Sequence, residues 1–305
     1  MDEIQYIKHS HIDFTKWDAC IDRAPDGLIY ARSYFLNEMS PGWDALVMGD
    51  YETVMPLTHR HKWSVSYLYQ PAFCAELGVF STSILTKEKL HAFLAQIPAS
   101  FRYIDICLNR GNVFDHSAYP FRYRKNYILS LAESYATIVQ KYALNHRRNI
   151  KKAQNAQLFF DDNIPVHESV AIAHETIKEV SNITVRDYQS FIRVFEYAYK
   201  RRQAVSAGVR DDKGILLSVA VFFFYKNTWY YLLAGSTQKG RQLGAAHFLI
   251  DQFIARYSST ASFIDFEGSD MPSLAFFYGG FGAKEIAYPA LILNRLPLWI
   301  RWIKR

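Results

Sequence analysis

Runs of apolar and alternating residues, separated by short polar turns, divide the first half of the chain into predicted elements. Residues 43–49, 53–60 and 64–71 combine β-branched, aromatic and alternating apolar positions, which is typical of strands. A helix-like stretch follows at residues 86–97, and residues 101–108 predict a further strand. The first half therefore predicts an antiparallel meander that leads into a helix and then into another strand.

The second half repeats this order of elements. Strands are predicted at residues 204–210, 215–225 and 229–236, a helix at 245–257, and a last strand at 262–268. Such a repetition suggests two copies of one α/β unit. In each copy the last connection should be a right-handed crossover between parallel neighbours, so each sheet is predicted to be mixed.

The length of the chain agrees with this duplication, because 305 residues fit two domains of ordinary size better than one. We place the boundary near residue 130, which gives domains at residues 1–130 and 131–305, with no linker rich in Gly, Ser or Pro between them. The predicted fold class is α/β (α+β), with two domains that each hold a mixed, mostly antiparallel sheet flanked by helices.

A helical stretch, about residues 132–203, lies between the two copies. Residues 167–180 and 186–202 each predict a helix. Before them, one apolar stripe at helical spacing is formed by Tyr135, Ile138, Val139 and Tyr142, and it continues through His146, Ile150 and Ala153. The stripe predicts that the first part of this region packs one face on a core.

Composition narrows the class of protein. No apolar run approaches the roughly 18 residues of a membrane helix, and the first residues lack the apolar core of a secretory signal, so we expect a soluble protein of the cytoplasm. Cys20, Cys74 and Cys107 are odd in number and widely spaced, which favours buried thiols over disulfides or a zinc site. The formal charge of +6 favours anionic partners.

The segment from Ser236 to Phe253 changes character in its middle. A polar, glycine-containing stretch runs into a helix whose first turn has free backbone N–H groups and is therefore attractive to anions. Gly240 and Gly244 would let the backbone approach a ligand closely, and Arg241 adds a positive charge. The alternative is an ordinary glycine-containing turn between a strand and a helix.

The position of this loop resembles that of the pyrophosphate-binding loop in the GNAT superfamily of acyl-CoA N-acyltransferases. The motif of that family, Arg/Gln-x-x-Gly-x-Gly/Ala, is matched at three positions, Arg241, Gly244 and Ala246. The resemblance implies that this loop holds acetyl-CoA or another acyl-CoA, and that a backbone N–H of the preceding strand stabilises the oxyanion. The implied donor-binding residues are Leu233, Ala234, Arg241, Gln242, Leu243, Gly244, Ala245 and Ala246.

A second resemblance covers most of the chain, roughly residues 40–290. The duplicated unit, a basic helix at 145–154, and the sequences DFEG and FFYGGFGAK are similar to the FemAB/FemX-type group of tandem acetyltransferase-like proteins. Members of that group transfer an amino acid from aminoacyl-tRNA to the amino group of a cell-wall peptidoglycan precursor. The resemblance therefore implies tRNA as an alternative donor, while DNA is not an expected partner.

The basic helix places like charges at i, i+4 spacing, a pattern that weakens an isolated helix unless an anion or nearby carboxylates relieve it. The expected anion-binding residues are Arg147, Arg148, Lys151 and Lys152. Phosphates of CoA, of a nucleotide-linked substrate or of tRNA would fit them. A solvated charged face is the alternative.

Three side chains near the end of the chain are catalytic candidates. Strand alternation would place Asp265 and Glu267 on one face, where either could remove a proton from an acceptor amine. Alternatively they pair with basic residues or cap the next helix, as Ser269 and Asp270 could. The GNAT resemblance implies that Tyr278 protonates a leaving thiolate, with core packing as the alternative role.

The first copy lacks the loop motif. Its corresponding segment, residues 70–83, contains Pro71 and Glu76 and should bind a pyrophosphate poorly, so we assign it to structure or to acceptor recognition. The C-terminal tail, residues 296–305, mixes tryptophans with cations and would lie on a membrane surface or dock on the first domain.

These expectations together favour an N-acyltransferase acting on a small-molecule or peptide amine. The alternatives are aminoacyl-tRNA-dependent extension of a cell-wall peptide and non-catalytic binding of an anionic ligand. No cluster in the sequence has the spacing of a metal site.

Overall fold

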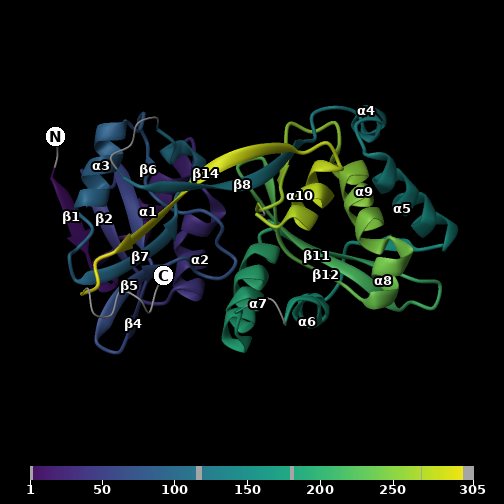
Figure 1. Cartoon of the computed structure of the whole chain (residues 1–305), viewed down its shortest axis with the longest axis horizontal. Helices are drawn as coiled ribbons and strands as arrows, with labels where there is room; N and C mark the ends of the chain where they lie inside the picture. Colours follow the sequence, from purple (N-terminus) through teal and green to yellow (C-terminus); the bar gives the residue numbers. More distant parts are fainter. Residues whose placement is uncertain (1–2, 115–118, 179–181, 269, 298–305) are drawn as a thin grey trace. The chain divides into compact units, whose positions relative to one another are not determined.

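The computed structural model describes residues 3–114, 119–178, 182–268 and 270–297 (Figure 1). The chain divides into two compact units. Unit 1 comprises Met1–Arg124 with Ala287–Arg305, and unit 2 comprises Lys125–Ile286. Strands β8 (Phe121–Ser130) and β14 (Lys284–Asn294) each lead from one unit into the other.

Compared with the expected boundary near residue 130, the structure assigns one further segment to unit 1. The second half of β14 pairs antiparallel with β7 (Phe101–Cys107), with Ala290 opposite Cys107, so the chain from Ala287 onward is grouped with the N-terminal unit. Ser269 and residues 298–305, which include most of the basic and aromatic tail, lie outside the described residues.

Unit 1 contains two sheets. The first has the strand order β1-β2-β3-β6 and the second includes β4-β5-β7-β14. The remaining elements of unit 1 are β1 (Ile4–Ile7), α1 (Phe14–Arg23), α2 (Ser33–Met39), β2 (Asp44–Met48), β3 (Thr53–Leu57), β4 (His59–Lys62), β5 (Val65–Tyr69), β6 (Phe80–Ser81) and α3 (Lys87–Ala95).

One expectation for this unit was wrong. The predicted strand at 53–60 is two strands in different sheets, because the chain passes from β3 to β4 at Thr58. The buried Thr58 hydroxyl donates to the Tyr69 carbonyl at 2.6 Å, which fixes this crossing. The expected meander is therefore divided between two sheets, whereas the expected parallel pairing of β5 with β7 is confirmed.

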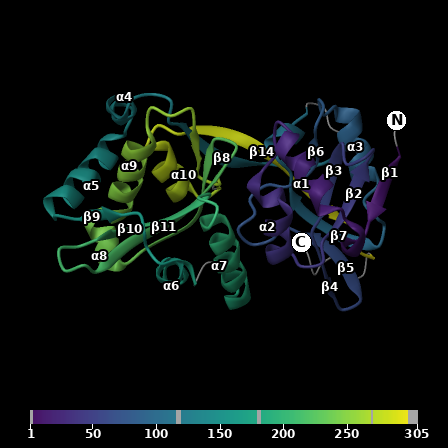
Figure 2. The ribbon, with the colours of Figure 1, turned by 180° about the vertical axis from the view of Figure 1, so that it is seen from behind.

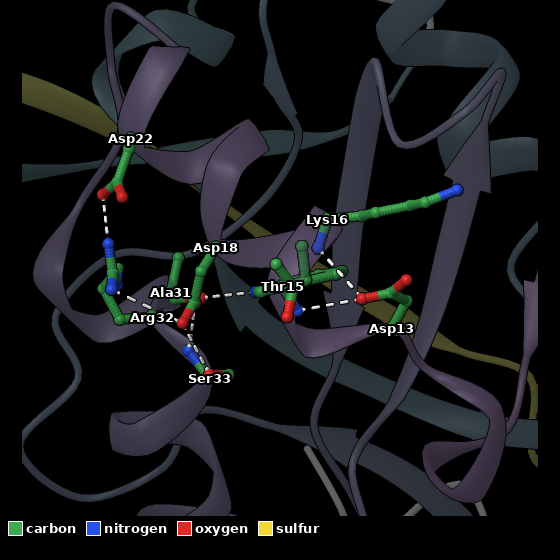
Figure 3. Close-up of polar contacts among 9 residues, drawn as sticks. Asp13, Thr15, Lys16, Asp18, Asp22, Ala31, Arg32 and Ser33 are labelled. Carbon is green, nitrogen blue, oxygen red and sulfur yellow. Dashed lines mark hydrogen bonds and ion pairs between the residues drawn. The ribbon is translucent and has the colours of Figure 1, made fainter.

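Polar contacts hold the first two helices of unit 1 together (Figure 3). The Asp13 carboxylate caps α1 by accepting the backbone N–H groups of the residues two and three positions further along. Asp18 on α1 accepts both the N–H and the hydroxyl of Ser33, at 2.8 Å each. The Arg32 guanidinium forms ion pairs with Asp18 and Asp22, so α2 is tied to α1 at two successive residues.

Unit 2 follows the predicted order closely. Its strands are arranged in the order β8-β13-β12-β11-β10-β9. The elements are α4 (Tyr135–Gln140), α5 (Leu144–Asn155), β9 (Phe159–Asp161), α6 (Val166–Ile177), α7 (Val185–Tyr199), β10 (Ala204–Arg210), β11 (Leu216–Tyr225), β12 (Thr228–Ser236), α8 (Gln238–Leu243), α9 (Ala245–Tyr257), β13 (Phe263–Asp265) and α10 (Pro272–Gly279). The expected parallel pairing of β12 with β13 is confirmed.

Helices cover both faces of this sheet, with α5, α9 and α10 on one side and α6 and α7 on the other (Figure 2). The ring of Phe253 on α9 stacks on Phe222 of β11 at 3.7 Å between centroids, which fixes that helix on the sheet. The expected apolar stripe of residues 135–153 is largely buried, but it runs over two helices, α4 and α5.

Three general expectations can be compared with the structure. The three cysteines are free and buried, as expected. No helix in the described part of the chain is long and apolar enough to cross a bilayer. Within the same residues, no group of three or more His, Cys, Asp and Glu side chains could hold a metal ion.

Candidate functional site

The pairing between strands β12 and β13 of unit 2 is short. They pair over three residues, ending with Tyr230 opposite Asp265, and β13 stops there while β12 continues to Ser236. From the residue after Tyr230 to Ser236, one edge of β12 is therefore not paired with β13. Such an opening exposes strand N–H and C=O groups to a ligand.

The direction of each N–H along this stretch follows from its neighbours. Thr237 N–H donates to the Leu217 carbonyl at 2.9 Å, whereas Ser236 N–H donates to the Thr176 hydroxyl on α6 at 3.1 Å. Successive N–H groups alternate between the two edges of a strand. The N–H of Ala234 therefore points toward the edge that β13 has left, while that of Leu233 points toward β11.

A cavity of about 390 Å³ lies at the end of β12. It is lined by Ala171, Ile172, Glu175, Thr176, Ser236, Thr237, Gln238 and Arg241. The Arg241 guanidinium donates to the Ser236 carbonyl at 2.7 Å, so this cation is held at the cavity wall while much of the side chain stays exposed. The Glu175 carboxylate is paired with Lys178 at 2.6 Å.

The segment predicted as a loop is mostly helical. Helix α8 spans Gln238–Leu243, and Gly244, with a φ of +75°, joins it directly to α9. A Cβ at Gly244 would overlap the Asn149 carbonyl of α5, and one at Gly240 would overlap the Leu217 carbonyl. Both glycines thus admit neighbouring backbone of the same chain, a use that the sequence alone did not reveal.

The other residues of the motif divide between surface and core. Gln242 is exposed and Leu243 packs on the core of unit 2. Ala245 is fully buried and Ala246 is half-buried in the first turn of α9. Of the predicted donor-binding residues, Arg241 is the one that lines the cavity.

The basic helix α5 lies beside this joint, because Asn149 contacts Gly244. Arg147 is exposed, and its guanidinium donates to the carbonyls of Tyr142 and Gln140 at 3.1 and 2.6 Å. Arg148, Lys151 and Lys152 are exposed, and none of them forms an ion pair or hydrogen bond with a described residue. All four predicted cations are therefore exposed, and Arg147 differs from the other three in that its side chain is bonded to the end of α4.

The expectation that Asp265 and Glu267 share a strand face was wrong. Strand β13 ends at Asp265, and Glu267 has a φ of +64°, in the left-handed region. Asp265 is 2% exposed, and its carboxylate accepts the N–H of Glu267 at 3.0 Å. Gly268 follows at φ +73°, where a Cβ would overlap the Lys125 carbonyl. Asp265 thus shapes the turn that presents Glu267, at a backbone angle that is strained for a glutamate.

Aromatic rings gather next to Glu267. Phe266 stacks on Tyr278 of α10 at 4.8 Å between centroids. Tyr231 of β12 and Tyr127 of β8 approach the Tyr278 ring at 6.2 and 6.1 Å. We call Tyr127, Tyr231, Phe266 and Tyr278 the aromatic box; Tyr278 is 6% exposed.

Burial changes the acidity of Glu267 and of two tyrosines of the aromatic box. Burial raises the pKa of the Glu267 carboxyl well above its usual range. Burial and the nearby Glu267 charge raise the pKa of the Tyr278 hydroxyl, and burial and Tyr278 do the same for Tyr231. A carboxyl group with a raised pKa next to a protonated tyrosine is suited to proton transfer.

Several residues at this site were not predicted from the sequence. Thr176 and Glu175 on α6 reach the cavity only through the packing of that helix on β12, and the sequence carried no signal for this. His247, in the first turn of α9, faces His146 of α5 at 4.7 Å between ring centroids. The sequence held one signal for this pair, the polar ring of His146 within the apolar stripe of α5.

Comparison with solved structures identifies the fold. The chain is similar to the crystal structure of FemX, with 15% identity, a TM-score of 0.65, and 99% of this chain and 100% of that chain covered. It is also similar to L-PGS from Bacillus licheniformis, at 9% identity and TM-score 0.55, covering 95% of this chain and 94% of that one.

A tandem GNAT protein from the clavulanic acid biosynthesis pathway matches at 12% identity and TM-score 0.52, covering 97% of this chain and 99% of that chain. No protein-family model matches the sequence, and no curated protein matches it. The chain therefore has the tandem GNAT-like fold, with mixed, mostly antiparallel sheets flanked by helices, that was expected from its sequence.

Proposed function

We propose that unit 2 transfers an acyl group from acyl-CoA to an amine. The observation that carries this proposal is the carboxyl group of Glu267, whose pKa burial raises, beside the aromatic box where β12 and β13 separate. A protonated amine has no lone pair with which to attack a carbonyl. The amine must therefore enter as the neutral base, and a carboxylate beside it can accept the proton that the nitrogen loses after it attacks.

The proposed reaction is a direct transfer. The acceptor nitrogen attacks the thioester carbonyl, the nitrogen–carbon bond forms, and the carbon–sulfur bond breaks as the tetrahedral intermediate collapses. Glu267 accepts the proton that leaves the nitrogen, and Tyr278 gives its proton to the thiolate. Two protons move, and the enzyme regains its starting state when the proton on Glu267 returns to Tyr278 through solvent.

The coupling between these two groups favours this assignment. The Glu267 charge is one cause of the raised pKa of Tyr278. Once Glu267 has accepted the amine proton it is neutral, and that contribution disappears. Tyr278 therefore becomes a stronger acid at the stage when the thiolate needs a proton.

The donor would approach along the open edge of β12. Ala234 N–H points to that edge and is our candidate to stabilise the oxyanion, whereas Leu233 N–H is directed toward β11. The cavity at the end of the strand offers Arg241 as a partner for a phosphate of CoA. Gln242 and Ala246 would contact the same ligand from α8 and α9, with Leu243, Gly244 and Ala245 supporting them.

A second candidate donor is aminoacyl-tRNA, which is supported by one observation. Arg148, Lys151 and Lys152 are exposed and unpaired among the described residues, beside the joint between α8 and α9. Solvent-facing cations of this kind are suited to a phosphate backbone. In this version an oxygen ester replaces the thioester, and Glu267 keeps its role.

Differential thermal stability tests the donor. Millimolar CoA or acetyl-CoA should raise the melting temperature of the wild type, since about 100-fold excess over Kd adds about 2.7 kcal/mol to the free energy of unfolding. Arg241→Glu should lose this shift, and Lys200→Glu, at an exposed cation that follows α7 and does not line the cavity, should keep it. No shift with either ligand, together with salt-sensitive binding of charged tRNA that Arg148→Glu with Lys152→Glu weakens, would replace acyl-CoA by the second donor.

A further inference from the structure

The segment that carries Tyr278 is held by helix α5. His146 is fully buried, and its Nε2 lies 2.8 Å from the Phe277 carbonyl oxygen, one residue before Tyr278. Ala143, at the start of α5, donates its backbone N–H to the Gly280 carbonyl at 2.8 Å. Two hydrogen bonds thus attach the end of α10 to the start of α5.

The chemistry of these partners fixes the state of the imidazole. A carbonyl oxygen only accepts hydrogen bonds, so Nε2 carries a proton. Nδ1 is buried and has no hydrogen-bond partner among the described residues. Burial lowers the pKa of His146, against the effect of the Phe277 bond, which is consistent with a neutral ring surrounded by aromatic residues.

The surroundings leave room for this ring and little else. A Cβ on Gly280 would overlap the imidazole of His146, so the second glycine of the sequence Tyr278-Gly-Gly-Phe281 admits the ring. Phe281 meets it edge to face at 4.6 Å, and His247 from α9 meets it at 4.7 Å. The basic helix, the start of α9 and the Tyr278 segment therefore converge on one side chain.

We infer that His146 is a positioning residue for acyl transfer, setting the location of the Tyr278 hydroxyl through its hydrogen bond to the Phe277 carbonyl. This inference rests on the proposed function of Tyr278. Its physical basis is that a small displacement of a proton donor sharply reduces a rate, while ligand binding at the cavity depends on other residues. His146 is therefore expected to affect kcat far more than the KM of the donor.

Two substitutions at this position test the hydrogen bond. His146→Leu removes the donor and should lower kcat about tenfold or more, with the donor KM within about twofold. His146→Gln places an amide N–H near the former Nε2 and should recover most of the loss. His167→Gln, an exposed histidine on α6, is the matched control and should behave as wild type. Equal kcat for Leu and Gln at position 146 would overturn the inference.

Gly280→Ala supplies an independent test of the attachment of α10 to α5. It should lower kcat in the wild type, where the new methyl group overlaps the ring, but much less in a His146→Ala background, where the space is open. Simple additivity of the two changes would contradict the inference.

A readout without catalysis separates failure of this inference from failure of the proposed function. Amide hydrogen exchange should show faster exchange of α10 in His146→Leu than in His146→Gln. If exchange follows this pattern but no donor supports turnover, the attachment of α10 by His146 is supported and the proposed reaction fails. If exchange of α10 is the same in all variants, the attachment of α10 by His146 is refuted.

Discussion

The two units treat the same structural position in opposite ways. In unit 1 the segment after β5 returns to the end of β7, where Leu77 forms a parallel bridge with Leu108. The Gln70 side chain accepts the N–H of Cys107 at 2.9 Å. In unit 2 the corresponding strands separate, and a cavity of about 390 Å³ lies at the end of β12.

Buried side chains complete the closure of unit 1. Asn112 accepts the N–H of Val79 at 2.8 Å and donates to its carbonyl at 2.9 Å, and Glu76 accepts the N–H of Arg110 at 3.0 Å. Side-chain amides and a carboxylate here occupy backbone groups that a ligand would otherwise use. The comparison teaches that one fold yields a structural unit or a candidate site according to what fills the end of its parallel pair.

The largest expected effect distinguishes Glu267 of unit 2, which is half-buried, from Glu76 of unit 1, which is buried. Glu267→Gln in unit 2 should lower the rate of acyl transfer by about 100-fold or more, the usual contribution of a general base. Glu76→Gln in unit 1 should lower the free energy of unfolding but leave kcat unchanged. Glu196→Gln, on the exposed face of α7, should also leave kcat unchanged. Steady-state kinetics of the three variants decide this, and a normal rate for Glu267→Gln would remove it from the mechanism.

A smaller effect is expected at the cavity wall. Arg241→Gln should weaken binding of the acyl donor by about 10- to 100-fold, because a hydrogen bond to a charged group contributes about 1.5–3 kcal/mol. Isothermal titration with CoA measures this change. Undiminished affinity would place the donor away from the cavity. The end of the parallel strand pair would then bind no donor in either unit.

The closure of unit 1 is tested by Asn112→Ala. Removing this amide leaves the N–H of Val79 without its partner in the interior, while the Val79 carbonyl keeps the Asn109 amide at 3.0 Å, and the free energy of unfolding should fall by about 1–3 kcal/mol. Denaturant titration gives the change, and turnover under native conditions should stay at the wild-type level. A loss of kcat without a loss of stability would show that unit 1 takes part in the chemistry.

The smallest effect concerns pH. The pKa of Glu267 is raised from its ordinary 4.5, so between 4.5 and the higher folded value the native state binds more protons than the unfolded state. The contribution of this group to stability therefore declines as pH rises through that window. The wild type should lose stability relative to Glu267→Gln as the pH rises above 4.5, as thermal melts of both proteins would show; parallel curves would argue against a raised pKa.

Much of unit 2 was predictable because local pattern and tertiary role agree there. The apolar run of β11 and the stripe of α9 bury the residues that their periodicity selects, and both elements were predicted to within a residue of their bounds. Tyr278 and Glu267 were chosen as catalytic candidates from the sequence; the structure brings them near each other, and their catalytic roles stay predictions. The turn at Glu267 was missed because a left-handed glutamate depends on Asp265 and on Gly268 packing against Lys125.

The sequence by itself determined the duplicated order of strands and helices, since alternation and helical spacing are properties of neighbouring residues. It also determined which unit carries the Arg241 motif. Only the tertiary structure decided that Gly240 and Gly244 admit backbone, that Thr176 reaches β12, and that His146 holds the Tyr278 segment. Each of these depends on groups distant in the chain meeting at atomic distance, and local periodicity contains no information about such meetings.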